Sequence, residues 1–274
     1  MRVAGANERD DRFRVPLRLE LTDTRVVHAT ILTIGNELVS GDVENTNASW
    51  LGRRLEQLGV HVVLSASVPD DLDRIVSFVR REAPLVDRFV ATGGLGGTPD
   101  DLTREALAAA FDVPQEIVPE LDAGLRARFT GDPEYAARWA ALPRGARPLE
   151  NPLGGAPGFL IGNVWVLPGL PREMEAMFDR YAAELAGGRA IGAWRGRYRT
   201  RESTIAPALV AVTERFPDVL VGSYPSFDPP APEVEVVLKS SDPELLAHAA
   251  AFLEDSLANL GQWPRSSPRD TSPT

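Results

Sequence analysis

The segment TGGLGGTPDDLTREAL, residues 92–107, decides how the rest of the chain is interpreted. It places four glycines, a proline and two adjacent aspartates between a strand-like pattern, DRFVAT (87–92), and a helix-like pattern. Glycines let a backbone turn sharply and let a ligand approach closely, and a phosphate favours such a loop before a helix. Two carboxylates repel a phosphate, but a divalent cation between them reverses the sign. The segment therefore predicts a magnesium-bridged diphosphate site.

A structural interpretation of the same residues stays open. Thr98 is a plausible helix N-cap, Pro99 suits the first helical position, and Asp101 follows Thr98 by three residues, close to a capping box. The aspartates would then stabilise a helix N-terminus. This interpretation leaves the run of glycines in the glycine loop, residues 93–98, without an explanation.

Strand and helix patterns alternate around this segment. Buried-strand patterns occur in HATILTIG (28–35) and VHVVLSA (60–66), and apolar residues at helical spacing follow each of them. This alternation predicts an α/β fold with a three-layer α/β/α arrangement and a mostly parallel sheet. Ligands of such sheets bind beyond the carboxyl ends of the strands, where the glycine loop stands.

The segment NELVSGDVENT (36–46) is predicted to be a loop at the end of the first strand. It has two interpretations. It is a solvated polar loop in which Asn45 or Thr46 caps the next helix, or Glu37 faces the glycine loop while Asn36, Asn45 and Asn47 bind a heterocycle or ribose.

A third Gly/Pro-rich region follows the pattern GFLIGNVWVL (158–167), which predicts two strands joined at Gly162-Asn163. LPGLPREM (167–174) is typical of a turn leading into a helix with Pro171 in its first turn. The start of that helix is a second candidate phosphate contact.

Beyond Gly188 the pattern changes to strand (197–201), helix (205–216), two strands (219–224 and 233–239) and a last helix from about residue 241. We therefore predict a second, smaller α+β domain. The predicted division is an N-terminal arm or edge strand over 1–27, the nucleotide or pterin domain over 28–186, the small domain over 187–262, and a disordered tail over 263–274.

Composition limits the function. A net charge of −10 and a pI of about 4.9 argue against a nucleic-acid partner. The sequence has no cysteine, and its three histidines lack metal-ligand spacing, so any metal is expected to be a hard cation bound by oxygen. An apolar run of about 18 residues is lacking, so we expect no membrane span. The first 28 residues lack the apolar stretch of a signal peptide, and we expect a cytoplasmic protein.

The segments GNELVSGDVENTNASWLGRRLEQLGV (35–60), ATGGLGGTPDDLTREALA (91–108) and APGF with LPGLPREM (156–174) together resemble the molybdopterin-binding fold. The match is closest to the N-terminal part of the competence/damage-inducible protein A (CinA) family. It covers about residues 28–185, and the small domain resembles the insert that follows this fold in CinA-like proteins. The family commonly has Asp at positions 36 and 45, and Pro at position 97, where this chain has Asn36, Asn45 and Gly97.

The resemblance implies a site for a nucleotide diphosphate or pterin, and a homo-oligomer. It implies metal-dependent hydrolysis of ADP-ribose- or FAD-like pyrophosphates with Mg²⁺, Mn²⁺ or Co²⁺; the alternatives are molybdopterin binding or adenylylation, and a non-catalytic ligand-binding module. Nicotinamide-mononucleotide deamidation is not expected, because the sequence ends before the amidohydrolase domain of full-length members. The catalytic residues it implies are Asp100, Asp101, Glu37 and Glu173, with Asp100 and Asp101 also holding the metal. The ligand-binding residues it implies are Thr92, Gly93, Gly94, Leu95, Gly96, Gly97, Thr98, Asn36, Gly41, Asn45, Asn47, Pro168, Gly169 and Pro171.

Overall fold

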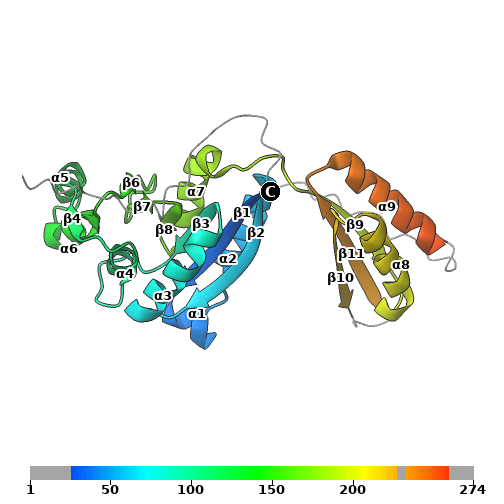
Figure 1. Ribbon diagram of the computed structural model, residues 1–274. Helices are drawn as coiled ribbons and strands as arrows, with labels where there is room; N and C mark the ends of the chain where they lie inside the picture. The colour runs from blue at the N-terminus through cyan, green and yellow to red at the C-terminus, as the bar shows by residue number, and fades with distance from the viewer. Residues whose placement is uncertain (1–25, 227–231, 259–274) are drawn as a thin grey trace, which may run out of the picture. The chain divides into compact units, whose positions relative to one another are not determined.

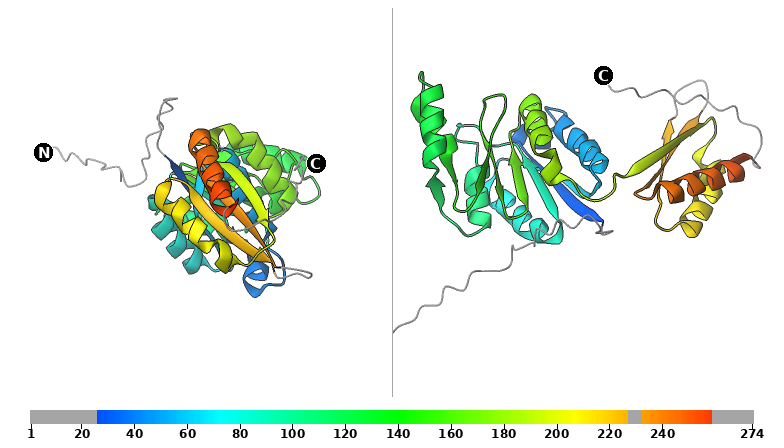
Figure 2. Two further views of the ribbon diagram at one scale, coloured as in Figure 1. Left: turned by 90° about the vertical axis from the view of Figure 1, so that its right-hand side faces the viewer. Right: turned by 90° about the horizontal axis from the view of Figure 1, so that it is seen from above.

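The computed structural model describes residues 26–226 and 232–258 of the 274-residue chain (Figures 1 and 2). The chain separates into two compact units, Met1–Gly188 and Arg189–Thr274. Nearly all of the predicted arm (1–27) and the whole of the predicted tail (263–274) lie outside the described residues.

The first unit is built on a six-stranded sheet with the order β2-β1-β3-β8-β7-β6. Strands β2, β1, β3 and β8 run parallel, and β7 and β6 complete the sheet in antiparallel pairs. The strands are β1 (Val27–Ile34), β2 (Val60–Val68), β3 (Arg88–Thr92), β6 (Arg147–Leu149), β7 (Gly158–Ile161) and β8 (Val164–Leu167). The predicted mostly parallel sheet is thus confirmed.

Helices cover both faces of this sheet (Figure 1). Alternate residues of β1 separate into two hydrophobic clusters, with Ile31 in one and Leu32 in the other. The first cluster contains side chains of α2 (Thr46–Gln57) and α7 (Pro171–Leu185), and the second contains those of α3 (Leu72–Glu82) and α4 (Thr103–Ala110). Both faces of a parallel sheet must be covered, which gives the three predicted layers.

An excursion of the chain lies between α4 and β6. Its elements are β4 (Gln115–Ile117), α5 (Pro119–Arg128), α6 (Pro133–Ala137), the 3-10 helix η3 (Arg138–Ala140) and β5 (Ala141–Pro143). β4 and β5 pair with each other rather than with the main sheet. Leu125 and Trp139 join the same hydrophobic cluster as α4, so the excursion is packed onto the unit's core.

Two expectations about local structure are wrong. The predicted loop 36–46 contains a short helix, α1 (Asn36–Ser40), which ends at Gly41 in the left-handed conformation with φ 83°. The helix expected to start at Thr98-Pro99 starts at Thr103, with Leu102 at its N-cap. Residues 98–101 instead close a turn, in which the Asp101 N–H donates to the Thr98 carbonyl.

The second unit is a three-stranded antiparallel sheet of order β10-β11-β9 with two helices packed against it. Its elements are β9 (Gly192–Tyr198), α8 (Glu202–Arg215), β10 (Leu220–Ser226), β11 (Glu233–Ser240) and α9 (Pro243–Ala258). The smaller α+β domain is confirmed, although its first strand begins at residue 192 rather than 197. Within the described part of the chain, no helix is both long and apolar enough to cross a membrane.

The β7–β8 turn is fastened to the end of α3 by a buried asparagine. Asn163 donates from its side-chain amide to the carbonyls of Ala83 and Val86, both at 2.8 Å. These carbonyls belong to the first residue of the 3-10 helix η2 (Ala83–Leu85), which links α3 to β3, and to the residue that follows η2. The contact therefore aligns the start of β3 with the start of β8.

Asn163→Ala is expected to lower the free energy of unfolding by about 1–3 kcal/mol, because it leaves two buried carbonyls without a donor. Leu85→Ala is the control, since Leu85 lies on η2 with 70% of its surface exposed; its change should stay within about 0.5 kcal/mol. Urea denaturation measures both. Equal effects of the two substitutions would contradict the role given to Asn163.

Candidate functional site

Four parallel strands end at one edge of the main sheet, and the candidate site lies there. Backbone hydrogen bonds tie these ends together: the Gly35 N–H donates to the Val68 carbonyl at 3.1 Å, and the Gly93 N–H donates to the Leu167 carbonyl at 3.2 Å. The segments that begin at this edge are α1, the Pro69–Asp71 connection, the glycine loop and the Pro168–Leu170 connection. Carboxyl ends of parallel strands are where ligands of such sheets bind.

The first two glycines of the glycine loop are required by the backbone. Gly93 and Gly94 have φ values of +108° and +63°. A Cβ on Gly93 would collide with the carbonyl of Ile34, and one on Gly94 would collide with the Thr103 side chain. The Thr103 hydroxyl donates to the Gly93 carbonyl at 2.8 Å. The glycines thus let the loop turn sharply from β3 onto the start of α4.

One buried arginine holds the middle of the glycine loop. Arg104, in α4, donates to the carbonyl of Leu95 at 2.8 Å and to the carbonyl of Gly96. Arg104 is 4% exposed and forms no ion pair with any residue of 26–226 or 232–258. Burial lowers its pKa, yet a guanidinium keeps its proton at neutral pH. A positive charge without a paired carboxylate therefore lies directly behind the loop.

Asp101 is turned onto the glycine loop rather than outward. Its carboxylate accepts hydrogen bonds from the backbone N–H groups of Gly96 and Thr98, both at 2.8 Å, and from the Thr98 hydroxyl. The capping interpretation is thus partly right: Asp101 satisfies backbone donors, but those of the loop instead of those of the helix.

The tip of the glycine loop is held by the excursion. The Gly97 N–H donates to the Tyr135 hydroxyl at 3.2 Å, and Arg138 donates to the Gly97 carbonyl at 3.0 Å. Tyr135 lies so close that a Cβ on Gly97 would overlap its ring. Hence α6 and η3 fix the backbone of the loop at Gly97.

Four acidic side chains gather at this edge. Desolvation raises the pKa of Asp70, and the neighbouring charges of Glu37, Asp100 and Asp101 raise it further, against a hydrogen bond from the Asn36 N–H that lowers it. The nearby Thr98 side chain and the Asp100 N–H lower the pKa of Asp100, which is exposed and ionised at neutral pH, although the Thr98 hydroxyl proton itself is donated to Asp101. Burial is thus the largest cause of the raised pKa of Asp70, and repulsion from the three neighbouring carboxylates is a smaller one.

Three asparagines predicted to contact a ligand have protein partners. The Asn36 N–H donates to the Asp70 carboxylate at 2.8 Å. Asn45 caps α2 by accepting from the Ala48 N–H and donates to Thr33 and Ser67. Asn47 donates to the Gly169 carbonyl at 2.8 Å and to Thr92 at 3.4 Å. For Asn45 the structure favours the capping interpretation.

The remaining predicted residues lie partly beside the glycine loop and partly away from it. Thr92 donates its hydroxyl to the Pro168 carbonyl at 2.7 Å, and Gly169 lies against Gly93, so these residues form the floor beside the glycine loop. Glu173 instead accepts from Asn151 at 2.9 Å, in a network with the loop 151–156. The Leu95 side chain is buried in the core, Gly41 ends α1, and Pro171 starts α7.

Four residues of this site escaped the sequence analysis: Asp70, Arg104, Tyr135 and Arg138. Asp70 had a usable signal, because it follows β2 at the same sheet edge as the glycine loop. For Arg104 the only signal was its place one residue after the helix start. Tyr135 and Arg138 are 38 and 41 positions away from Gly97, and no local pattern links them to it.

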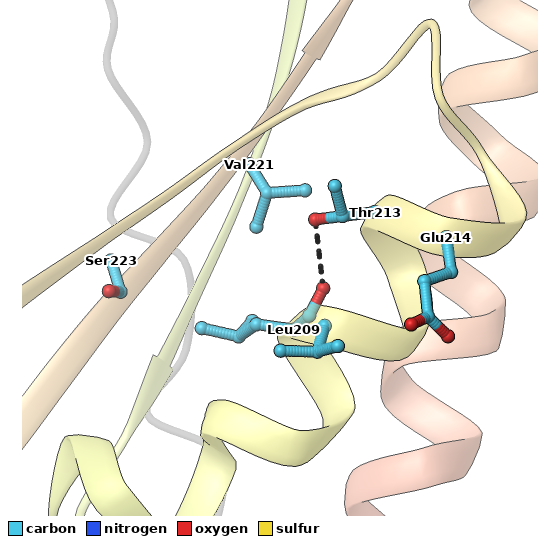
Figure 3. Close-up of a pocket in the computed structure, with 6 residues that line it drawn as sticks. Leu209, Thr213, Glu214, Val221 and Ser223 are labelled. Carbon is cyan, nitrogen blue, oxygen red and sulfur yellow. Dashed lines mark hydrogen bonds between the residues drawn. The ribbon is translucent and has the colours of Figure 1, made fainter.

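Within the described residues, the acidic edge of the sheet included, no group of three or more His, Asp or Glu side chains is arranged to hold a metal ion. The second unit has a pocket between α8 and β10, but its Thr213 hydroxyl is bonded to the Leu209 carbonyl and half of its lining side chains are apolar (Figure 3). Its lining residues are Leu209, Val210, Thr213, Glu214, Val221 and Ser223.

Residues 30–187 match the family model described as a probable molybdopterin binding domain, and residues 197–261 match the model described as the middle domain of FAD synthase. A solved structure of the protein CinA, of unknown function, from Thermoplasma acidophilum aligns with a TM-score of 0.55 and 34% identity. The alignment covers 58% of this chain and 98% of that one.

Relatives of similar sequence differ in length. A CinA-like protein of Frankia casuarinae is 44% identical over 56% of this chain, and one of Parasynechococcus marenigrum is 38% identical over 82%. The chain spans only 38% and 56% of the lengths of these two relatives. A Pyrobaculum calidifontis protein is 38% identical over 78% of this chain and 87% of its own length.

Asp70→Asn is expected to raise the melting temperature of the metal-free protein at neutral pH. Because the pKa of Asp70 is raised in the folded state, the folded protein binds this proton more tightly than the unfolded chain does, and stability falls as the pH rises from 3.8 through the raised pKa. Asparagine keeps an oxygen acceptor and carries no charge. The gain should therefore vanish below pH 3.8.

Thermal unfolding between about pH 3.5 and pH 8 with a chelator present measures this difference. Asp73→Asn is the matched control, because Asp73 is exposed and lies in the first turn of α3. A stability difference between wild type and Asp70→Asn that does not change with pH would refute the electrostatic explanation.

Proposed function

Because this chain belongs to the molybdopterin-binding domain family and, within it, to the CinA-like proteins, we propose that it hydrolyses nucleotide pyrophosphates of the ADP-ribose or FAD type with a divalent cation. The observation that carries this proposal is the glycine loop, whose N–H groups at residues 96 and 98 both donate to a carboxylate, while Arg104 and Arg138 hold the loop's carbonyls. An anion-binding backbone beside several carboxylates suits a metal-neutralised diphosphate better than a free anion.

The acidic side chains fit a hard cation. Asp100 is exposed and ionised, and the pKa of Asp70 is raised by burial and, to a smaller extent, by the charges of Glu37, Asp100 and Asp101. We propose that Asp100 and Asp101 hold Mg²⁺, Mn²⁺ or Co²⁺, with Asp70 beside them and with oxygens of the substrate completing the shell. The cation would neutralise charge on the pyrophosphate and polarise its phosphorus–oxygen bonds.

The protein residues then have separate tasks. The glycine loop binds phosphate oxygens through backbone N–H groups, which stabilise negative charge as it develops. Arg104 keeps the carbonyls of this loop turned away from the substrate. Glu37, in α1 at the end of β1, is the better placed of the two candidate glutamates to orient the attacking water, since Glu173 is bonded to Asn151.

The substrate class is supported by the second unit. Its similarity to the middle domain of FAD synthase makes a flavin or adenine nucleotide a reasonable ligand for a chain that carries both units. FAD and ADP-ribose contain the same pyrophosphate linkage between an adenosine and a second group, so one site would accept the shared part.

A second candidate function is molybdopterin binding or adenylylation. The family model over residues 30–187 supports it, because it is described as a probable molybdopterin binding domain. Incubating the protein with ATP and molybdopterin, and following the formation of an adenylylated product, separates this function from hydrolysis. A non-catalytic module would bind nucleotide tightly in calorimetry and turn over none.

We expect hydrolysis of at least one of ADP-ribose, FAD, NAD and ATP with Mg²⁺, Mn²⁺ or Co²⁺. The Asp100→Ala/Asp101→Ala double variant should lose about 100-fold or more in kcat/KM, because the cation would lose its two protein ligands. Asp73→Ala removes an exposed carboxylate from α3 and should change kcat/KM less than about twofold. Phosphate or mononucleotide release is the measurement, and an absence of turnover on the whole panel would overturn the proposed activity.

A further inference from the structure

The glycine loop presents its carbonyls and its N–H groups to opposite sides. Arg104 and Arg138 hold the three successive carbonyls of residues 95–97. In a trans peptide, the carbonyl of one residue and the N–H of the next point in opposite directions. Each N–H group of residues 96–98 is therefore directed away from the arginine that holds the carbonyl of the same peptide, and we call these N–H groups the donor side of the loop.

A carboxylate of the protein itself occupies the donor side. Asp101 accepts from the N–H groups of Gly96 and Thr98 at 2.8 Å each, while the intervening N–H of Gly97 is bonded to Tyr135. Backbone N–H groups that converge on one anion form an anion-binding concavity. The Asp101 carboxylate thus stands where an external oxyanion would be bound.

The buried positive charge of Arg104 also favours binding of an anion at this loop. Arg104 is 4% exposed, and no residue within 26–226 or 232–258 forms an ion pair with it. A buried cation without a counter-ion is costly unless an anion lies nearby. The carboxylates of Glu105 and, to a smaller extent, Asp101 act on Arg104 electrostatically, so Asp101 supplies part of the negative charge.

We propose that Asp101 masks an oxyanion site, and that two oxygens of a substrate phosphate displace its two carboxylate oxygens from the N–H groups of Gly96 and Thr98 and from the Thr98 hydroxyl. The proposal rests on the proposed function only in taking the displacing anion to be a phosphate. The exchange replaces one anion by another on the same donors, so no backbone donor is left unpaired.

Displacement also changes the acidic edge. The released carboxylate joins Asp70 and Asp100, whose charges already act on one another. A third free carboxylate favours a divalent cation there. Binding of the cation and binding of the pyrophosphate therefore strengthen each other, and by linkage the effect is mutual.

The test measures metal-free binding of inorganic pyrophosphate by calorimetry with a chelator present. Asp101→Ala removes the competing anion, whereas Asp100→Ala removes the same charge from the adjacent, exposed residue. We expect Asp101→Ala to bind pyrophosphate about tenfold or more tightly than Asp100→Ala does, because only the former frees two N–H donors. Equal affinities, or no binding by either variant, would overturn the proposal.

A measurement on the wild-type protein covers the case in which Asp101→Ala does not fold. With ¹⁵N-glycine labelling, saturating pyrophosphate should shift the amide resonance of Gly96 and leave that of Gly124, in α5, in place. An unchanged Gly96 amide resonance at saturating pyrophosphate would overturn the proposal.

These outcomes are separate from those of the activity panel. Tighter binding by Asp101→Ala in a protein that cleaves no pyrophosphate would leave the masked site standing without the proposed hydrolysis. Hydrolysis by the wild-type protein, together with equal pyrophosphate affinities of Asp101→Ala and Asp100→Ala, would support the proposed hydrolysis and overturn the masked site.

Discussion

The rest of the site depends on the two hydrogen bonds that Arg104 makes to the carbonyls of the glycine loop. Glycine has the widest choice of backbone conformations, so a loop with four of them loses much entropy when it is ordered. A buried guanidinium with a rigid fork of donors fixes two peptide planes at once. Because those planes are fixed, the direction of the N–H groups is fixed as well, before any ligand arrives.

The sheet supplies the rigid frame for this arrangement. The floor of the site consists of strand ends joined by Thr92, Pro168, Asn47 and Gly169, and the β7–β8 turn is held to the end of α3 by Asn163. The acidic residues at the edge of this sheet lower the stability of the folded protein. Desolvation and neighbouring charges raise the pKa of Asp70, so the folded protein maintains a charge repulsion that binding of a cation would relieve.

The layered fold was predictable because buried parallel strands and the helices between them carry strong periodic patterns. The glycine loop was predictable because positions such as Gly93, with φ +108°, require glycine. The start of α4 was not, since the TPDD sequence fits a helix cap and a turn equally well, and a contact between Asp101 and Gly96 decides it. Short strands such as β4, with three residues, hold too few positions to show a period.

The two ends of the glycine loop are fastened to different parts of the chain. Arg104 and Thr103 of α4 anchor its base. Tyr135 and Arg138 hold its tip from the excursion between α4 and β6, which contributes no strand to the main sheet. Local unfolding of the excursion would release the tip while the base keeps its shape. The base of the loop therefore keeps one conformation, whereas the position of its tip depends on whether the excursion stays folded.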